Sequence, residues 1–300
     1  TAAPLTLYYG EFVTPGVVDV VEMEHDPVRK LLAPRHGLGV LGSALPALAG
    51  KYPTHRLFAE ATEAEVLLTL QGSPQRLQAR TLTTMAFLQR GDHLEVVALP
   101  QEAQWSPAFG IGVADLDGDG REDLVLGQNS SDLPARDHRL DAGTGLVLGG
   151  IGEGRFEALS PVESGVTVHG DQRGVAVCDL EHDVRMDFAM AQNAGPTRLF
   201  QNRRGRPGLR VRLIGSADNP DGVGAAVRVR SAGRVGPLRE VQAGSGYWSE
   251  NARVTVHPLP EAAEAVWVRW PGGAERQYPV PPGVAEVAVD PAGGIRITKQ

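Results

Sequence analysis

Four aspartates in one short stretch have the residue type and the spacing that bind a metal ion. They are Asp115, Asp117, Asp119 and Asp123, at relative positions one, three, five and nine. The backbone carbonyl of Arg121, at position seven, can add a further oxygen. Carboxylates at alternate positions of a sharply turning loop converge on one point, and oxygen ligands without His or Cys suit calcium. We therefore predict a calcium site in this stretch, which we call the central loop.

The flanks of the central loop indicate strands and not helices. Short apolar runs without helical period, 111–114 and 124–126, enter and leave it, so a strand–loop–strand unit is expected. Gly118 and Gly120 permit the positive φ angles of a sharp turn. The alternative is a solvated acidic turn, because Asp and Gly are common in turns. Against it, five acidic side chains within nine residues, counting Glu122, would repel one another without a counter-ion.

The same spacing recurs 64 residues later, in a stretch that we call the second loop. The side-chain oxygens would come from Asp179, Glu181, Asp183 and Asp187, at positions one, three, five and nine. The backbone carbonyl at position seven is that of Arg185. His182 and Val184 replace the two glycines, and Val184 is β-branched where a positive φ is expected. Two interpretations stay open: a second calcium site, or a remodelled loop held by its own hydrogen bonds.

The composition and motifs exclude several classes of protein. The chain of 300 residues has a formal net charge of −7 and scattered basic residues, so it offers no broad basic face for nucleic acid. Its single cysteine, Cys178, cannot form an intrachain disulfide. No segment reaches the roughly 18 apolar residues of a membrane span. No fingerprint of a nucleotide-binding or hydrolytic enzyme occurs, which argues against catalysis without deciding it.

Residues 109–127, FGIGVADLDGDGREDLVLG, resemble the FG-GAP repeat of integrin α-subunits and of bacterial proteins with VCBS-type repeats. In that family each repeat is one blade of a β-propeller, with calcium in the loop between its first two strands. The resemblance implies ligand roles for the four aspartates and the Arg121 carbonyl of the central loop. Residues 6–24 look like a worn copy, which keeps the strand–turn–strand shape but has Val13 and Pro15 at the middle ligand positions.

The C-terminal part of the chain is similar to the ASPIC/UnbV domain, which usually follows FG-GAP repeats, as in the cartilage acidic protein family and its bacterial relatives. The stretches 219–225, 244–249 and 266–273 carry this resemblance. Short alternating strands with Gly and Pro turns also predict a small β-sandwich or barrel there. The expected strands are 209–214, 225–229, 253–256, 265–270, 285–289 and 295–298.

We therefore expect an all-β chain in two parts. Residues 1–203 would form a partial propeller of about three blades, and residues 204–300 the small β domain, with a boundary in the Gly/Arg/Pro stretch 203–208. Because propellers typically need four to eight blades, further blades from the same precursor or another chain, or a second copy, are expected to complete the ring.

A helical insertion is expected within the first blade, at about residues 40–70. Ser43 and Thr54 precede short helical patterns and are predicted to be helix caps. The segment 83–100 reads as a hairpin that turns near Gly91. We expect this hairpin to supply the outer strands of the first blade.

The long polar loop 128–145 is the predicted contact surface for a ligand. Its candidate ligand-binding residues are Arg136, His138, Arg139 and Asp141, which can form charge-assisted hydrogen bonds. The favoured function is a calcium-binding module, secreted, periplasmic or at the cell surface, that binds a protein or glycan. Export is inferred because weak calcium loops fill only where calcium is near millimolar. The alternative is a calcium-stabilised enzyme acting on polysaccharide, with His138 as general base in the same loop.

Overall fold

The computed structural model describes residues 4–131, 139–259 and 261–299. This part of the chain is mostly β, as the sequence predicts. Its strands pair antiparallel, apart from β14 (Gly208–Leu213) and β21 (Glu286–Val289), which run parallel. None of the described sheets closes on itself. The chain divides into two compact units, Thr1–Thr83 and Thr84–Gln300, which we call unit 1 and unit 2 and describe separately.

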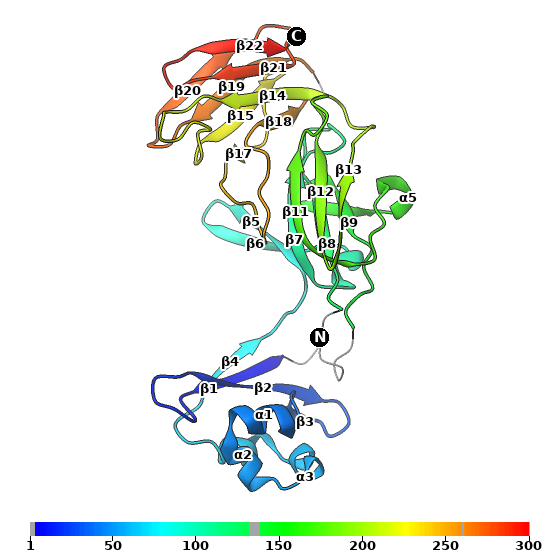
Figure 1. Ribbon diagram of the computed structural model, residues 1–300, viewed down its shortest axis with the longest axis vertical. Coiled ribbons are helices and arrows are strands. Elements are labelled where there is room, and N and C mark those ends of the chain that lie inside the picture. Colours follow the sequence, from blue (N-terminus) through cyan, green and yellow to red (C-terminus); the bar gives the residue numbers. More distant parts are fainter. Residues whose placement is uncertain (1–3, 132–138, 260, 300) are drawn as a thin grey trace. The chain divides into compact units, whose positions relative to one another are not determined.

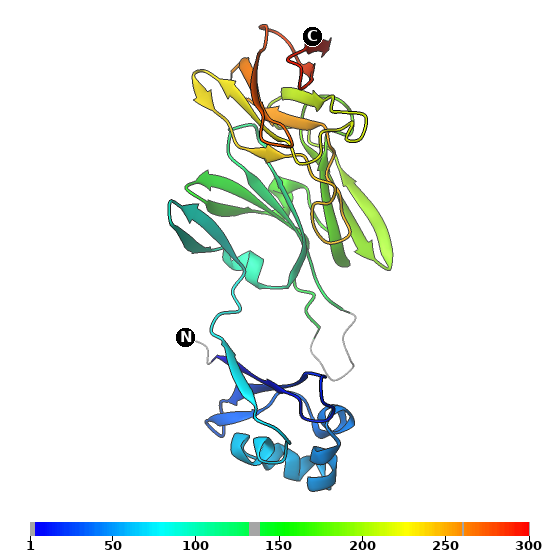
Figure 2. The ribbon, with the colours of Figure 1, turned by 90° about the vertical axis from the view of Figure 1, so that its left-hand side faces the viewer.

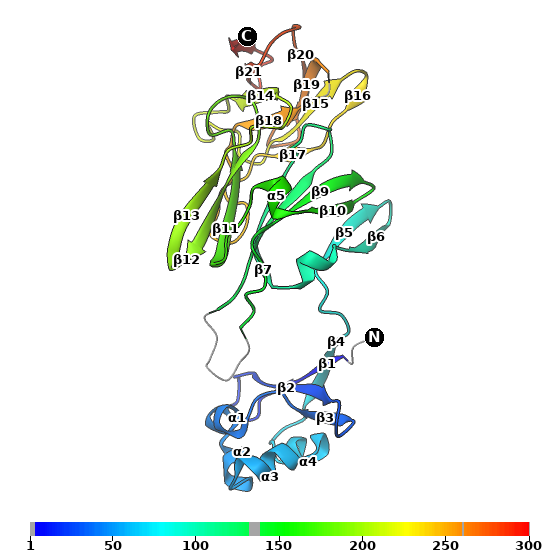
Figure 3. The same cartoon turned by 90° about the vertical axis from the view of Figure 1, so that its right-hand side faces the viewer.

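Unit 1 is a four-stranded sheet with helices on one face. The strand order is β3-β2-β1-β4, with β1 Leu5–Gly10, β2 Asp19–Asp26, β3 Leu31–Pro34 and β4 Gln75–Ala79. Between β3 and β4 the chain forms α1 Leu38–Ala44, α2 Pro46–Lys51, α3 His55–Glu60 and α4 Glu63–Leu67. These helices lie together on one side of the sheet (Figures 1 and 3). Val21 and Met23 of β2 share a buried core there with Leu41, Leu48 and Phe58.

The helices lie where the insertion was predicted, but only one of the two predicted caps is confirmed. The Thr54 hydroxyl accepts the Leu57 N–H and caps α3. Ser43 lies inside α1 and donates to the Val40 carbonyl, so its prediction as a cap is wrong. The helix begins earlier, after Gly37, which brings Leu38 and Leu41 into the buried core.

The β1–β2 hairpin has the strand–turn–strand shape predicted from residues 6–24. The Asp19 carboxylate, at relative position nine, accepts the N–H groups of Phe12 and Val13 at 2.9 and 3.0 Å. The prediction that the hairpin 83–100 completes this sheet is wrong. The positions beside β2 and β1 are taken by β3 and β4, because the chain returns along β1 directly after the helices.

Unit 2 begins with the hairpin β5 (Met85–Arg90) and β6 (His93–Ala98), which turns at Gly91 as predicted and forms a sheet of its own. After a short 3₁₀ helix (Gln101–Gln104), a four-stranded sheet follows in the order β10-β9-β8-β7. Its strands are β7 Ala108–Ala114, β8 Asp123–Gln128, β9 Leu146–Gly152 and β10 Arg155–Leu159. The hairpin lies alongside β9 and β10 (Figures 2 and 3), where Ala86 packs against the core around Leu126 and Leu148.

A helical turn, α5 (Pro161–Ser164), leads to a three-stranded sheet with β11 Asp171–Cys178, β12 Asp187–Asn193 and β13 Gly195–Phe200. The two sheets share a core in which Val125 and Val147 meet Val175 and Val177. Gly110 is needed at this junction, because a Cβ there would lie 2.8 Å from the Val175 nitrogen. β7 and β11 therefore approach at backbone distance, which places the central and second loops at corresponding strand ends.

The C-terminal part of unit 2 consists of two sheets around one core. The first has the order β18-β14-β21-β22, with β18 Thr255–Pro258 and β22 Ile295–Lys299. The second contains β15 Ala226–Ser231, β16 Arg234–Val235, β17 Arg239–Glu240, β19 Ala263–Arg269 and β20 Glu275–Pro279. Leu209 and Val287 from one sheet and Val227 and Val266 from the other are fully buried together. The arrangement is that of a small sandwich, one of the two predicted architectures. The predicted boundary near 203 lies inside unit 2, and as a domain boundary it stays a prediction.

Candidate metal centre

The central loop joins β7 to β8 and brings together three of its four aspartates. Asp115 follows the last residue of β7, and Asp123 is the first residue of β8. Each of Asp115, Asp117 and Asp123 offers one carboxylate oxygen to a group in which these oxygens lie within 4.8 Å of one another. Asp115 and Asp123 are buried and Asp117 is exposed. The group has the hard oxygen donors that a divalent cation prefers.

Backbone hydrogen bonds to the two buried carboxylates shape the central loop. Asp115 accepts the N–H groups of Gly118 and Gly120, at 2.7 and 2.9 Å, while both glycines hold positive φ angles of 81° and 89°. Asp123 accepts the N–H of Leu116 at 2.7 Å and that of Gly150, on β9, at 2.8 Å. The loop is thus held in its turn with the carboxylates facing inward.

The electrostatics of this group favour a bound cation. Burial raises the pKa of Asp115 to about 7, against the lowering effect of its two backbone N–H donors, and the neighbouring carboxylates of Asp123 and Asp117 add to the rise. Burial is also the main cause that raises the pKa of Asp123. Among the described ion pairs, none involves these three aspartates. A divalent cation would offset both the desolvation and the repulsion, so the residues present fit a metal.

Asp119 and Arg121, the other predicted ligands, contact each other. The Asp119 carboxylate accepts the Arg121 backbone N–H at 2.8 Å and forms an ion pair with the Arg121 guanidinium at 2.7 Å. Asp119 therefore lies outside the group of three aspartates. The ligand role of the Arg121 carbonyl stays a prediction.

In the second loop the aspartate at position one again accepts two backbone N–H groups, but from positions five and six instead of four and six. The Asp179 carboxylate accepts the N–H groups of Asp183 and Val184, at 2.9 and 3.2 Å. His182 and Val184 hold positive φ angles of 58° and 61°, at the positions of Gly118 and Gly120. Asp187 accepts the Leu180 N–H, as Asp123 accepts that of Leu116. The loop shape therefore depends on the aspartates at positions one and nine more than on glycine.

The second loop differs because an arginine already compensates its first carboxylate. The Arg210 guanidinium, from β14, lies 2.8 Å from the Asp179 carboxylate, and the two side chains are 7% and 2% exposed. Asp183 is paired with Arg185, and Glu181 accepts from Gln201. The described residues of this loop do not form a group of the kind found in the central loop. No local spacing could have pointed to Arg210, which lies beyond the second loop in the sequence.

The C-terminal part of unit 2 contacts the two preceding sheets through the central loop and the second loop. The Arg206 N–H donates to the Asp117 carbonyl at 3.0 Å, so the segment after β13 lies directly on the central loop. Arg239 pairs with Glu122 at 3.1 Å with both side chains largely buried. At the second loop, the Lys299 ammonium donates to the His182 carbonyl at 2.8 Å. These contacts fix the loops between the sheets.

The predicted ligand-binding set of the loop 128–145 lies only partly within the described residues. Arg136 and His138 lie outside them. Arg139 and Asp141 form an ion pair with each other at 2.6 Å. At the base of the loop, the Asn129 side chain accepts from the Gly143 N–H at 2.9 Å and donates to its carbonyl at 2.7 Å. The role of this loop in binding stays a prediction.

Residues 215–294 match the model of the family described as ASPIC and UnbV. The match covers most of the two C-terminal sheets, so that part of the resemblance drawn from the sequence is confirmed. Comparison with curated proteins finds no match for the chain. None of the described helices is long and apolar enough to cross a membrane.

Proposed function

We propose that this chain is a calcium-binding module that acts by binding a protein or a glycan. The observation that carries the proposal is the group formed by Asp115, Asp117 and Asp123, with oxygens within 4.8 Å and no cationic side chain paired to them in the described structure. Calcium is the ion of choice because flexible oxygen sites that combine carboxylates, carbonyls and water suit it better than the near-ideal octahedron that magnesium demands.

The architecture that goes with this function is a set of FG-GAP-type propeller blades followed by an ASPIC/UnbV-type domain. The sheets β7–β10 and β11–β13 would be consecutive blades, since each starts with a strand, an acidic loop and a second strand. Their first strands, β7 and β11, pack side by side with glycine at the contact. In this proposal further blades, from the same precursor or from another chain, complete the propeller.

The proposed place of action is outside the cytoplasm: secreted, periplasmic or at the cell surface. The proposal takes the loop to be a weak calcium site, and a weak site is filled only where calcium is near millimolar. In this proposal calcium stiffens the loop on which the C-terminal sheets rest. A stiffer scaffold lowers the ordering cost of binding a partner.

Calcium-dependent thermal stability tests this proposal. Because calcium would bind the folded chain only, it should raise the melting temperature, with a stabilisation of about 2.7 kcal/mol at a concentration 100 times the Kd. Asp117→Ala removes an exposed member of the group and should abolish the shift without unfolding the chain. Glu181→Ala, at the same position of the second loop, is the matched control and should keep it. Equal melting with calcium and with chelator in the parent protein would refute the calcium site.

A further inference from the structure

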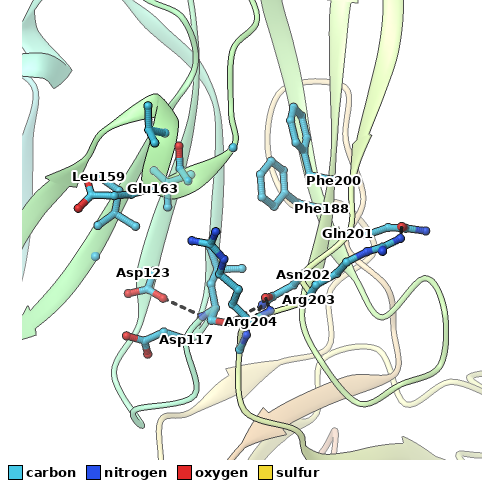
Figure 4. Close-up of a pocket in the computed structure, with 17 residues that line it drawn as sticks. Asp117, Asp123, Leu159, Glu163, Phe188, Phe200, Gln201, Asn202, Arg203 and Arg204 are labelled. Carbon is cyan, nitrogen blue, oxygen red and sulfur yellow. Dashed lines mark hydrogen bonds between the residues drawn. The ribbon is translucent and has the colours of Figure 1, made fainter.

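A pocket of about 480 Å³ opens between the sheets β7–β10 and β11–β13, next to the central loop. It is within the size range of small-molecule sites. One wall comes from β12 and β13, the opposite wall from β10 and α5, and one end from the segment 201–205. Figure 4 shows Arg204 of this segment between Asp123 of the central loop and the rings of Phe188 and Phe200. The walls of the pocket are mainly apolar but include Glu163 of α5, and one end carries Asp117, Asp123 and Arg204.

The apolar walls suit a flat ring. Phe188 and Phe200 stack with their ring centroids 4.8 Å apart and their planes 21° apart. Across the pocket lie Leu159 and Val162, and Val162 as a residue is 88% exposed. Aromatic rings prefer offset-stacked or edge-to-face contacts with other rings. A planar apolar group entering the pocket would therefore cover apolar surface on both sides.

The carboxylates that line the pocket already accept hydrogen bonds from the chain, and each keeps further acceptor sites. Asp123 accepts two backbone N–H groups, Glu163 accepts the N–H and hydroxyl of Ser160, and Asp117 accepts the Asp119 N–H. By contrast, the Arg204 guanidinium has neither a hydrogen bond nor an ion pair among the described residues. An arginine fork presents paired N–H donors that match a carboxylate.

We propose that this pocket binds a small organic carboxylate with a planar ring system. The ring lies against Phe200 between the two walls, and the carboxylate pairs with the Arg204 guanidinium. The inference goes beyond calcium binding, because it depends on residues of β13 and of the segment 201–205 that are not members of the metal group.

Three probes of equal shape and different charge test the proposal by calorimetric titration: naphthoate, naphthylmethanol and naphthylmethylamine. Naphthoate should bind most tightly and the cationic amine most weakly. Arg204→Gln should lower the affinity for naphthoate about tenfold, which corresponds to the loss of one charge-assisted pair, and should leave the affinity for naphthylmethanol unchanged. Arg203→Gln is the matched control, because Arg203 already donates to Gln201 at 3.1 Å. It should leave both affinities unchanged. Phe200→Leu should weaken the binding of all three probes.

Each titration is run in chelator and in calcium, and the effect of Arg204→Gln is expected in both. This separates the pocket from the calcium site, since either can fail alone. Tighter binding of the amine would overturn the proposal and assign the pocket to cations held by Asp117. Equal losses in the Arg203 and Arg204 variants would also overturn it, because they would show only general attraction by positive charge. The absence of saturable naphthoate binding would do the same.

Discussion

Asp115 and Asp179 hold the same place in their loops, yet their carboxylates have different partners. Both accept two backbone N–H groups from the turn. Only Asp179 has a guanidinium against it, from Arg210. A buried carboxylate needs a compensating charge. We therefore interpret the second loop as one in which an arginine of the chain takes the place that calcium would take in the central loop.

This interpretation predicts a large effect of one substitution. Arg210→Gln would leave the buried Asp179 carboxylate without its partner, which costs about 3–5 kcal/mol of the free energy of unfolding. Arg212→Gln is the matched control from the same strand. Arg212 is 48% exposed and 3.8 Å from Glu286, so its loss should cost less than about 1 kcal/mol. Denaturant unfolding in chelator measures both. A similar small loss in the two variants would contradict the role given to Arg210.

The central loop is held by the segment that leads to the C-terminal sheets. Gly118 and Gly120 both need positive φ, but their surroundings differ. A Cβ on Gly118 would lie 2.5 Å from the Arg206 Cβ and 2.9 Å from its nitrogen, whereas a Cβ on Gly120 meets nothing within 4 Å. Substituting Gly120 therefore tests the cost of the backbone conformation alone, and substituting Gly118 adds the loss of the contact with Arg206.

Gly120→Ala should destabilise unit 2 by about 1–2 kcal/mol, the cost of a left-handed residue with a Cβ. Gly118→Ala should cost clearly more, because the Arg206 backbone must also move away. Urea unfolding followed by tryptophan fluorescence measures the difference, with both variants compared in chelator. Equal losses would show that the contact between Arg206 and the central loop contributes nothing to stability.

The spacing of side-chain oxygens predicted both loops, because alternate carboxylates bond to the turn locally. It predicted the second loop even though Val184 is unsuited to its φ of 61°. The local spacing of residues does not reveal a partner that comes from another strand. Arg210 reaches Asp179 from β14. Asp119 pairs with Arg121, two residues away in the same loop, an ion pair that the spacing of the acidic residues alone does not predict.

The sequence predicted the strands themselves better than it predicted which strands lie side by side. The hairpin β5–β6 was predicted with its turn, but its location was not, since a hairpin pattern says nothing of the sheet beside it. The edge strand β4 was missed because its residues, QRLQA, are all exposed and lack the alternation that marks a strand. The C-terminal strands alternate clearly, and there the predicted and observed strands largely agree.

The number of calcium ions bound per chain shows whether the central loop alone holds the metal. Calcium is titrated calorimetrically into the metal-free protein, and the Asp117→Ala variant is titrated in parallel. We expect one calcium per chain in the parent protein, because the central loop has an uncompensated carboxylate group and the second loop has Arg210. We expect none in Asp117→Ala. Two ions per chain would show that Arg210 does not replace calcium. No binding in the parent protein would refute the calcium site in the central loop.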